Sequence, residues 1–184
     1  MPCNYASEDF LEMLSEIEPS KVKEREFHFP CMLKLRDGKI VERVICVEDS
    51  RGFEGDWWIH PKDVSEVLPS EERLPAALAT KLYEAGESGM GYEVFGLKTK
   101  EGKEFTCVTH NVVDFPQLPK GVRTSDIAEV FPHTGRDNFG SSDFYDRPPG
   151  STWCYYLKPK TERGGAGQRR QRAAPDLDDV ERKL

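Results

Sequence analysis

Two segments of the chain, HPKDVSEVLPS at residues 60–70 and RTSDIAEVFPH at residues 123–133, are nearly the same. The residues before each segment also match in one order. These upstream matches are Leu33-Lys34 with Leu97-Lys98, Asp37-Gly38-Lys39 with Glu101-Gly102-Lys103, and Cys46-Val47 with Cys107-Val108, and within the segments Asp63-Val64 matches Asp126-Ile127. Because self-similarity at such a spacing is typical of repeated supersecondary units, the sequence predicts two copies of one β module.

Each copy begins with a hairpin signal. In the first copy, Asp37-Gly38 separates the β-prone runs FPCMLKL and KIVERVICVED, and this residue pair favours a two-residue turn. A loop, a tight turn at PKDV and a short closing strand follow. This element order resembles the SH3-like and Sm-like small barrels over residues 27–70 and 90–133, a resemblance of fold that implies a strongly bent sheet. A single mixed sheet built from both hairpins is the alternative.

Helical signals stand before and between the two copies. Ser7 can cap a helix that places Phe10, Leu14 and Ile17 on one face and ends at Pro19. The fold class is therefore mainly β (α+β). The predicted organisation is an N-terminal helix and connector (1–26), the first β module (27–70), a linking helix (71–89), the second β module (90–133), an aromatic segment that wraps across the modules, with WCYYL as an edge strand (134–157), and a disordered tail (158–184).

Composition favours a soluble cytoplasmic protein. No apolar run approaches the ~18 residues of a membrane helix, and the first residues carry acids where a secretory signal carries bases. Five scattered cysteines show neither a disulfide framework nor a zinc-knuckle spacing, so we expect reduced thiols. They are Cys3, Cys31, Cys46, Cys107 and Cys154.

Sites for metals and cofactors are not expected. His28 with Cys31 and Cys107 with His110 suggest a zinc set, but residues three apart on a strand point to opposite faces. The glycines of GESGMGYEVFG precede a strand and lack the lysine of a phosphate-binding loop. We therefore predict no metal and no cofactor.

Two other functions have weaker support in the sequence than protein recognition. Three arginines of the segment 163–172, Arg169, Arg170 and Arg172, are candidate contacts to nucleic acid, but residues 1–157 carry 18 basic against 28 acidic side chains. A nucleic-acid-associated regulator is therefore the alternative function. A cysteine-dependent enzyme, with Cys46 or Cys107 beside His60 or His110, is the third, because no local motif supports it.

The favoured interpretation is a non-enzymatic binding or adaptor protein that recognises a protein partner. The loop of the first module carries Arg51, Phe53, Trp57 and Trp58, which are residue types enriched at interfaces. Neighbouring strand residues face opposite ways, so one tryptophan is expected in the core and the other on the surface. Burial of both, under the linking helix or the aromatic segment, stays open. The matching loop, DFPQLPKG, has no tryptophan.

Overall fold

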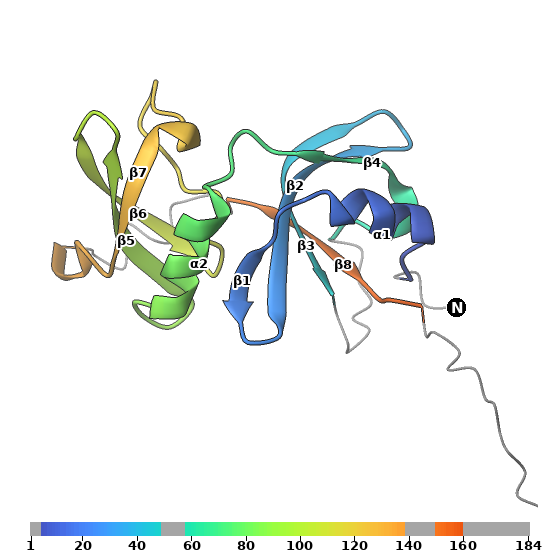
Figure 1. Ribbon diagram of the computed structural model, residues 1–184, viewed down its shortest axis with the longest axis horizontal. Helices are drawn as coiled ribbons and strands as arrows, with labels where there is room; N and C mark the ends of the chain where they lie inside the picture. Colours follow the sequence, from blue (N-terminus) through green and yellow to red (C-terminus); the bar gives the residue numbers. More distant parts are fainter. Residues whose placement is uncertain (1–4, 49–57, 139–149, 160–184) are drawn as a thin grey trace, which may run out of the picture.

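The computed structural model describes residues 5–48, 58–138 and 150–159, and the fold is mainly β with two α-helices (Figure 1). The strands form two sheets, each with one helix packed against it, and we call these two halves the first and second units. The predicted N-terminal helix and linking helix are both present.

The first unit contains helix α1 (Glu8–Ser15) and five strands. The strands are β1 (Ser20–Lys23), β2 (Glu26–Leu35), β3 (Ile40–Glu48), β4 (Val64–Pro69), which follows the 3-10 turn η1 (Pro61–Asp63), and β8 (Thr152–Tyr156). The sheet order is β1-β2-β3-β8, and β4 pairs with β2 beyond the end of β1. The last strand, β8, lies parallel to β3, so the predicted edge strand is confirmed.

The second unit contains helix α2 (Ala76–Ala85) and a three-stranded sheet in the order β6-β5-β7. Its strands are β5 (Tyr92–Thr99), β6 (Glu104–His110) and β7 (Ile127–Pro132), which follows the 3-10 turn η2 (Thr124–Asp126). A third 3-10 turn, η3 (Arg136–Asn138), comes after β7.

The two units share strand order and register. In the first unit Leu33 pairs with Val67, and in the second Leu97 pairs with Val130. In both pairs of strands the register then shifts after the next paired residue, between Lys34 and Leu35 and between Lys98 and Thr99. The hairpin turns also agree, since Gly38 and Gly102 have φ values of 88° and 85°, which non-glycine residues rarely adopt. The same pairing chemistry therefore builds both halves.

The structure corrects several expectations. Neither sheet closes into a barrel, so the SH3-like or Sm-like tandem is not found among the described residues. The linking helix begins at Ala76, five residues later than expected, because Pro75 occupies its N-cap. The charged connector contributes strand β1. A register shift inside β3 makes Val44, and not Cys46, the counterpart of Cys107: Cys31 pairs with Val44 as Phe95 pairs with Cys107.

Three groups of buried side chains hold the molecule together. Helix α1, capped by the hydroxyl of Ser7, buries Phe10 and Leu14 against one face of the first sheet. Helix α2 buries Ala79 and Leu82 against the second sheet. The third group lies between the units and consists of Ile45, Val47, Val112 and Phe115, with Trp153 and Tyr155 packed against them. The first sheet is thus covered by α1 on one face and by the second unit on the other.

Candidate functional site

A row of aromatic rings crosses the junction between the units. Trp58 contacts Tyr155 edge to face at 5.3 Å between centroids, and Tyr155 stacks on Trp153 at 5.5 Å with the ring planes 5° apart. Trp153 in turn contacts His28 at 5.5 Å, and His28 contacts Tyr83 at 5.3 Å. Alternation along β8 explains the arrangement: Trp153 and Tyr155 face the second unit, while Cys154 and Tyr156 face the core beneath α1.

The row ends at a buried carboxylate that links three elements. Asp114 is fully buried and accepts hydrogen bonds from the hydroxyls of Ser20, at 2.5 Å, and Tyr83, at 2.6 Å. Arg73 donates to the Ser20 oxygen at 3.3 Å. Burial raises the pKa of Asp114, and the bonds from Ser20 and Tyr83 oppose that rise. Because each partner comes from a different element, the network fixes β1 of the first unit against Asp114 and helix α2 of the second unit.

A pocket of ≈ 410 Å³ opens beside this network, and we call it the junction pocket. Its aromatic wall is made by Tyr83, Trp153 and Tyr155, and Asn111 adds an amide. The remaining lining is Val22, Lys23, Glu26, His28, Gly86, Glu87 and Glu93. A volume of this size lies within the ~300–1,000 Å³ range of small-ligand sites. Residues from β1, β2, α2, β5 and β8 thus meet around one space.

Glu93 is the most unusual residue of the junction pocket. Its side chain lies on β5, opposite Thr109 on β6, and is only 7% exposed. Its Oε2 atom is buried and forms no hydrogen bond with the described residues. Burial, with a smaller contribution from the charge of Glu87, raises the pKa of Glu93 to about 8, and the nearby hydroxyl of Thr109, whose Oγ1 atom is also buried without a hydrogen bond to the described residues, opposes that rise. At neutral pH this carboxyl group is therefore mostly protonated and uncharged.

His28 is also uncharged at neutral pH. Its ring is 4% exposed, and one nitrogen, Nδ1, lies 3.1 Å from the hydroxyl of Tyr83. Burial, followed by the charge of Lys23, lowers the pKa of His28 to about 4. Two ionisable groups in one pocket thus depart from their usual pKa values in opposite directions, as is common at functional sites.

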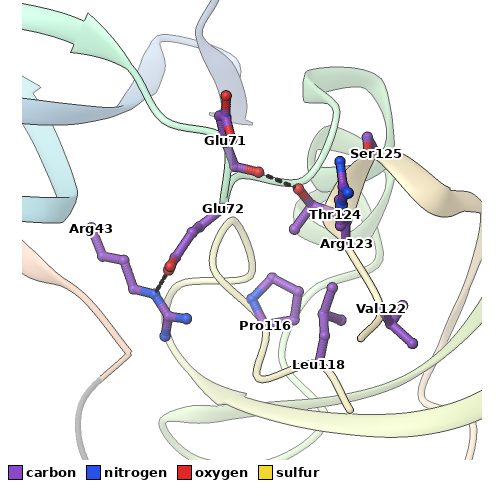
Figure 2. A pocket seen from close by; sticks show the side chains of 9 residues that line it. All are labelled: Arg43, Glu71, Glu72, Pro116, Leu118, Val122, Arg123, Thr124 and Ser125. Atoms are coloured by element: carbon purple, nitrogen blue, oxygen red, sulfur yellow. Dashed lines mark hydrogen bonds and ion pairs between the residues drawn. The ribbon is translucent and has the colours of Figure 1, made fainter. Parts of the chain in front are cut away.

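A second pocket, of ≈ 570 Å³, lies beside the segment between β4 and α2 (Figure 2). Two polar side chains of its lining are bonded to other lining residues: Arg43 points to Glu72 and forms an ion pair with it, and the Thr124 hydroxyl donates to the carbonyl oxygen of Glu71 at 2.7 Å. Pro116, Leu118 and Val122 line its apolar side. Although larger, this pocket presents no buried group with an unmet charge or hydrogen bond, so the junction pocket is the stronger candidate.

The predicted partner-binding residues fall largely outside the described part of the chain. Trp58 is 7% exposed and packs on Tyr155, so this tryptophan of the Trp57-Trp58 pair lies in the core. Arg51, Phe53 and Trp57 lie in residues 49–57, outside the described residues, and stay predictions. The same holds for Arg169, Arg170 and Arg172, and for most of the predicted tail.

Four cysteines can be placed, and all are buried and reduced. The Sγ atoms of Cys31 and Cys46 are 3.6 Å apart. Hydrogen bonds to the thiols of Cys154 and Cys31, together with burial, raise the pKa of Cys46 well above its usual range, which makes it a poor nucleophile. In the described parts of the chain, no group of three or more His, Cys, Asp and Glu is arranged to hold a metal ion.

Sequence reasoning missed His28, Glu93 and the aromatic face of β8 as one site. A signal for Glu93 exists in the repeat itself, since the offset that matches Leu33 with Leu97 also matches Phe29 with Glu93. A carboxylate standing where the sister strand has a phenylalanine indicates a role beyond packing. No comparable signal places β8 next to β3, because that contact joins segments more than a hundred residues apart.

The comparisons with known proteins assign no relative. A scan against family models, a search of curated proteins and a search of solved structures each gave no match. Within the described ranges, no helix is long and apolar enough to cross a membrane. The geometry of the junction pocket is therefore the main guide to function.

Proposed function

We propose that the protein is a non-enzymatic binding or adaptor protein that docks a protein partner at the junction of its two units. The observation that carries the proposal is the junction pocket, in which a buried carboxyl group without a hydrogen bond at Oε2 lies among half-buried aromatic rings. Aromatic side chains around a desolvated polar group are typical of interface hot spots. Arg51, Phe53 and Trp57 precede Trp58, the first ring of the aromatic row, in the sequence, and we propose them as further contacts to the partner.

The affinity experiment compares partners retained by the immobilised full chain with those retained by a Trp153→Leu variant. Loss of a specific partner with the variant is expected, because Trp153 lines the junction pocket. Tyr5→Leu is the matched control, since Tyr5 is 42% exposed and lies outside the pocket lining. Equal retention by all three proteins, with unchanged circular dichroism, contradicts the proposal.

An acid–base enzyme is the second candidate, favoured by the opposite pKa shifts of His28 and Glu93. Proton transfer is most efficient when the pKa of the catalytic group lies near the working pH. Glu93, with its pKa of about 8, meets this condition as an acid, whereas His28, with a pKa of about 4, is a weak base. The His28 ring is also held by Tyr83. Binding therefore explains the pocket better than proton transfer.

The two remaining functions have less support. A nucleic-acid-associated regulator would depend on the arginines of residues 163–172, and retention on nucleic acid that decreases with salt and disappears on their deletion would favour it. A cysteine enzyme would need an accessible thiolate, whereas the pKa of Cys46 is raised and Cys107 is buried.

A further inference from the structure

We propose that the junction pocket binds an organic cation, namely the guanidinium or ammonium group of a basic side chain. In this arrangement the carboxylate of Glu93 is the counter-ion, and Trp153 and Tyr155 form the wall. The inference rests on the proposed function and names what the partner inserts: an arginine or lysine side chain. Four features of the pocket support it.

The first feature is the charge balance of the lining. The pocket contains one lysine, Lys23, and three glutamates. Lys23 lies 3.6 Å from Glu26 across the β1–β2 turn. Within the described chain, Glu87 and Glu93 have no cationic partner. The unbalanced acids lie on the side of the pocket formed by β5 and the end of α2, so a cation is the complementary ligand.

The second feature is the buried oxygen of Glu93. A buried polar atom without a partner costs free energy, and a phenylalanine at this position would avoid that cost, as the partly buried Phe29 does in the first unit. The carboxyl group lines the junction pocket, where an entering donor can reach it. A guanidinium group offers several N–H donors to a carboxylate in matching geometry. A cationic ligand would therefore supply a donor to Glu93 Oε2, which has no hydrogen bond with the described residues.

The third feature is the end of helix α2. Gly86 and Glu87, which follow its last residue, line the pocket, and the last turn of the helix carries no basic side chain. The carboxyl end of a helix bears partial negative charge and stabilises nearby cations. This field adds to the charge of Glu87.

The fourth feature is the aromatic wall. Trp153 and Tyr155 are half-buried, stack with nearly parallel planes, and lie side by side along β8. Tryptophan and tyrosine rings attract cations placed near their faces. His28 beside them is neutral at pH 7 because of its lowered pKa, so it does not repel a cation.

The groups that face Glu93 determine how cation binding depends on pH. They are Lys23 and Glu26 at the β1–β2 turn, His28 on β2, Tyr83 on α2, Glu87 after α2, Tyr155 on β8 and, on the far side, His133 after β7. Near pH 7 Glu93 holds a proton, and a bound cation favours its release. Affinity should therefore rise with pH up to about 8 and then level off.

Calorimetric titration of the full chain tests this inference. The probe is Nα-acetyl-arginine methylamide, whose guanidinium group stays charged throughout, and the matched neutral probe is the citrulline analogue. We expect the citrulline probe to bind at least about tenfold more weakly. Titrations at pH 7 in phosphate and in Tris should give different apparent enthalpies, because binding releases a proton from Glu93, and this difference should disappear at pH 9.

Two glutamate variants separate the role of Glu93 from general charge. Glu93→Gln has the shape of the protonated acid but cannot ionise, so it should fold, bind arginine at least about tenfold more weakly and release no proton. Glu84→Gln makes the same change on exposed α2 surface outside the pocket, and should bind like the wild type. Wild-type affinity in Glu93→Gln, or equal affinity for the arginine and citrulline probes, overturns the inference.

A third comparison distinguishes this inference from the proposed function. If an arginine-containing pentapeptide binds more tightly than butylguanidinium, the cation belongs to a protein partner, and both proposals are supported. If butylguanidinium binds as tightly, with the Glu93→Gln effect intact, the cation inference holds and protein recognition at this face does not. If Trp153→Leu loses a partner while Glu93→Gln keeps it, protein recognition at this face holds and the cation inference does not.

Discussion

Glu93 on β5 occupies the position in the second unit that Phe29 on β2 occupies in the first. Both residues stand two positions before a buried pairing residue, since Phe29 precedes Cys31 and Glu93 precedes Phe95. The first unit fills this position with an aromatic ring, and the second keeps a carboxyl group with a raised pKa in a pocket. The backbone pairing is the same in the two units, but the side chains at this position differ. The fold therefore does not require a carboxyl group here, and we attribute Glu93 to the pocket.

Replacing Glu93 by glutamine should stabilise the protein at alkaline pH. The pKa of Glu93 is about 8 in the fold against 4.5 for an ordinary glutamate, so between these values the folded state holds more protons and stability falls as pH rises. The loss amounts to at most about 4 kcal/mol by pH 9. Urea unfolding at pH 5 and pH 9 measures it. The variant should lack this decrease, and a decrease equal to that of the wild type would contradict the assignment.

His28 should make the fold sensitive to acid. Its pKa is about 4 in the fold against 6.5 in the unfolded chain, so stability is lost as pH falls from about 6.5 towards 4. The contribution is at most about 3 kcal/mol. His28→Phe keeps a ring beside Trp153, and its unfolding free energy should change less between pH 7.5 and 4.5 than that of the wild type. His110→Gln, at an exposed position, should behave like the wild type.

Removing Asp114 should loosen the junction. Asp114→Ala leaves the Ser20 and Tyr83 hydroxyls without their acceptor inside the protein, and we expect a loss of about 3 kcal/mol in unfolding free energy. A double-mutant cycle with Tyr83→Phe should show coupling on the order of 1 kcal/mol, because the two residues share a hydrogen bond. Strictly additive effects in chemical denaturation would argue against the network.

The two neighbouring tryptophans should respond differently to truncation. Trp58→Ala removes a buried ring from its contact with Tyr155 and should cost about 3–5 kcal/mol in unfolding free energy. Trp57→Ala is predicted to weaken partner capture and to leave stability within ~0.5 kcal/mol. Thermal unfolding and affinity capture on the same samples check both outcomes. A severe loss of stability in Trp57→Ala would remove it from the proposed contacts to the partner.

The four placed cysteines should resist alkylation in the folded protein. All are buried, and the pKa of Cys46 is raised well above its usual range. Iodoacetamide at pH 8 should therefore modify Cys31, Cys46, Cys107 and Cys154 only after urea is added, as mass spectrometry can show. Selective modification of one of them in the native state would restore the cysteine enzyme as a candidate.

The sequence alone determined the local elements. The capping signal at Ser7, the Asp37-Gly38 turn and the matched segments around Asp63 and Asp126 predicted the first helix, the first hairpin and the closing strands, because each depends on residues a few positions apart. The segment Ser20–Lys23 was missed as a strand because it is short and mostly polar and pairs only at one end of β2.

Only the tertiary structure decided how these elements close and where the site lies. In the first sheet β1 and β4 share one side of β2 while β8 adds beyond β3, and the second sheet has only the three strands β6-β5-β7, so neither closes. The junction pocket gathers His28, Tyr83, Glu93 and Trp153 from segments spread over more than a hundred residues. Hydrophobic periodicity reports which face of a strand is buried but not what buries it. The pKa values of His28 and Glu93 follow from that burial, so no local pattern in the sequence could reveal them.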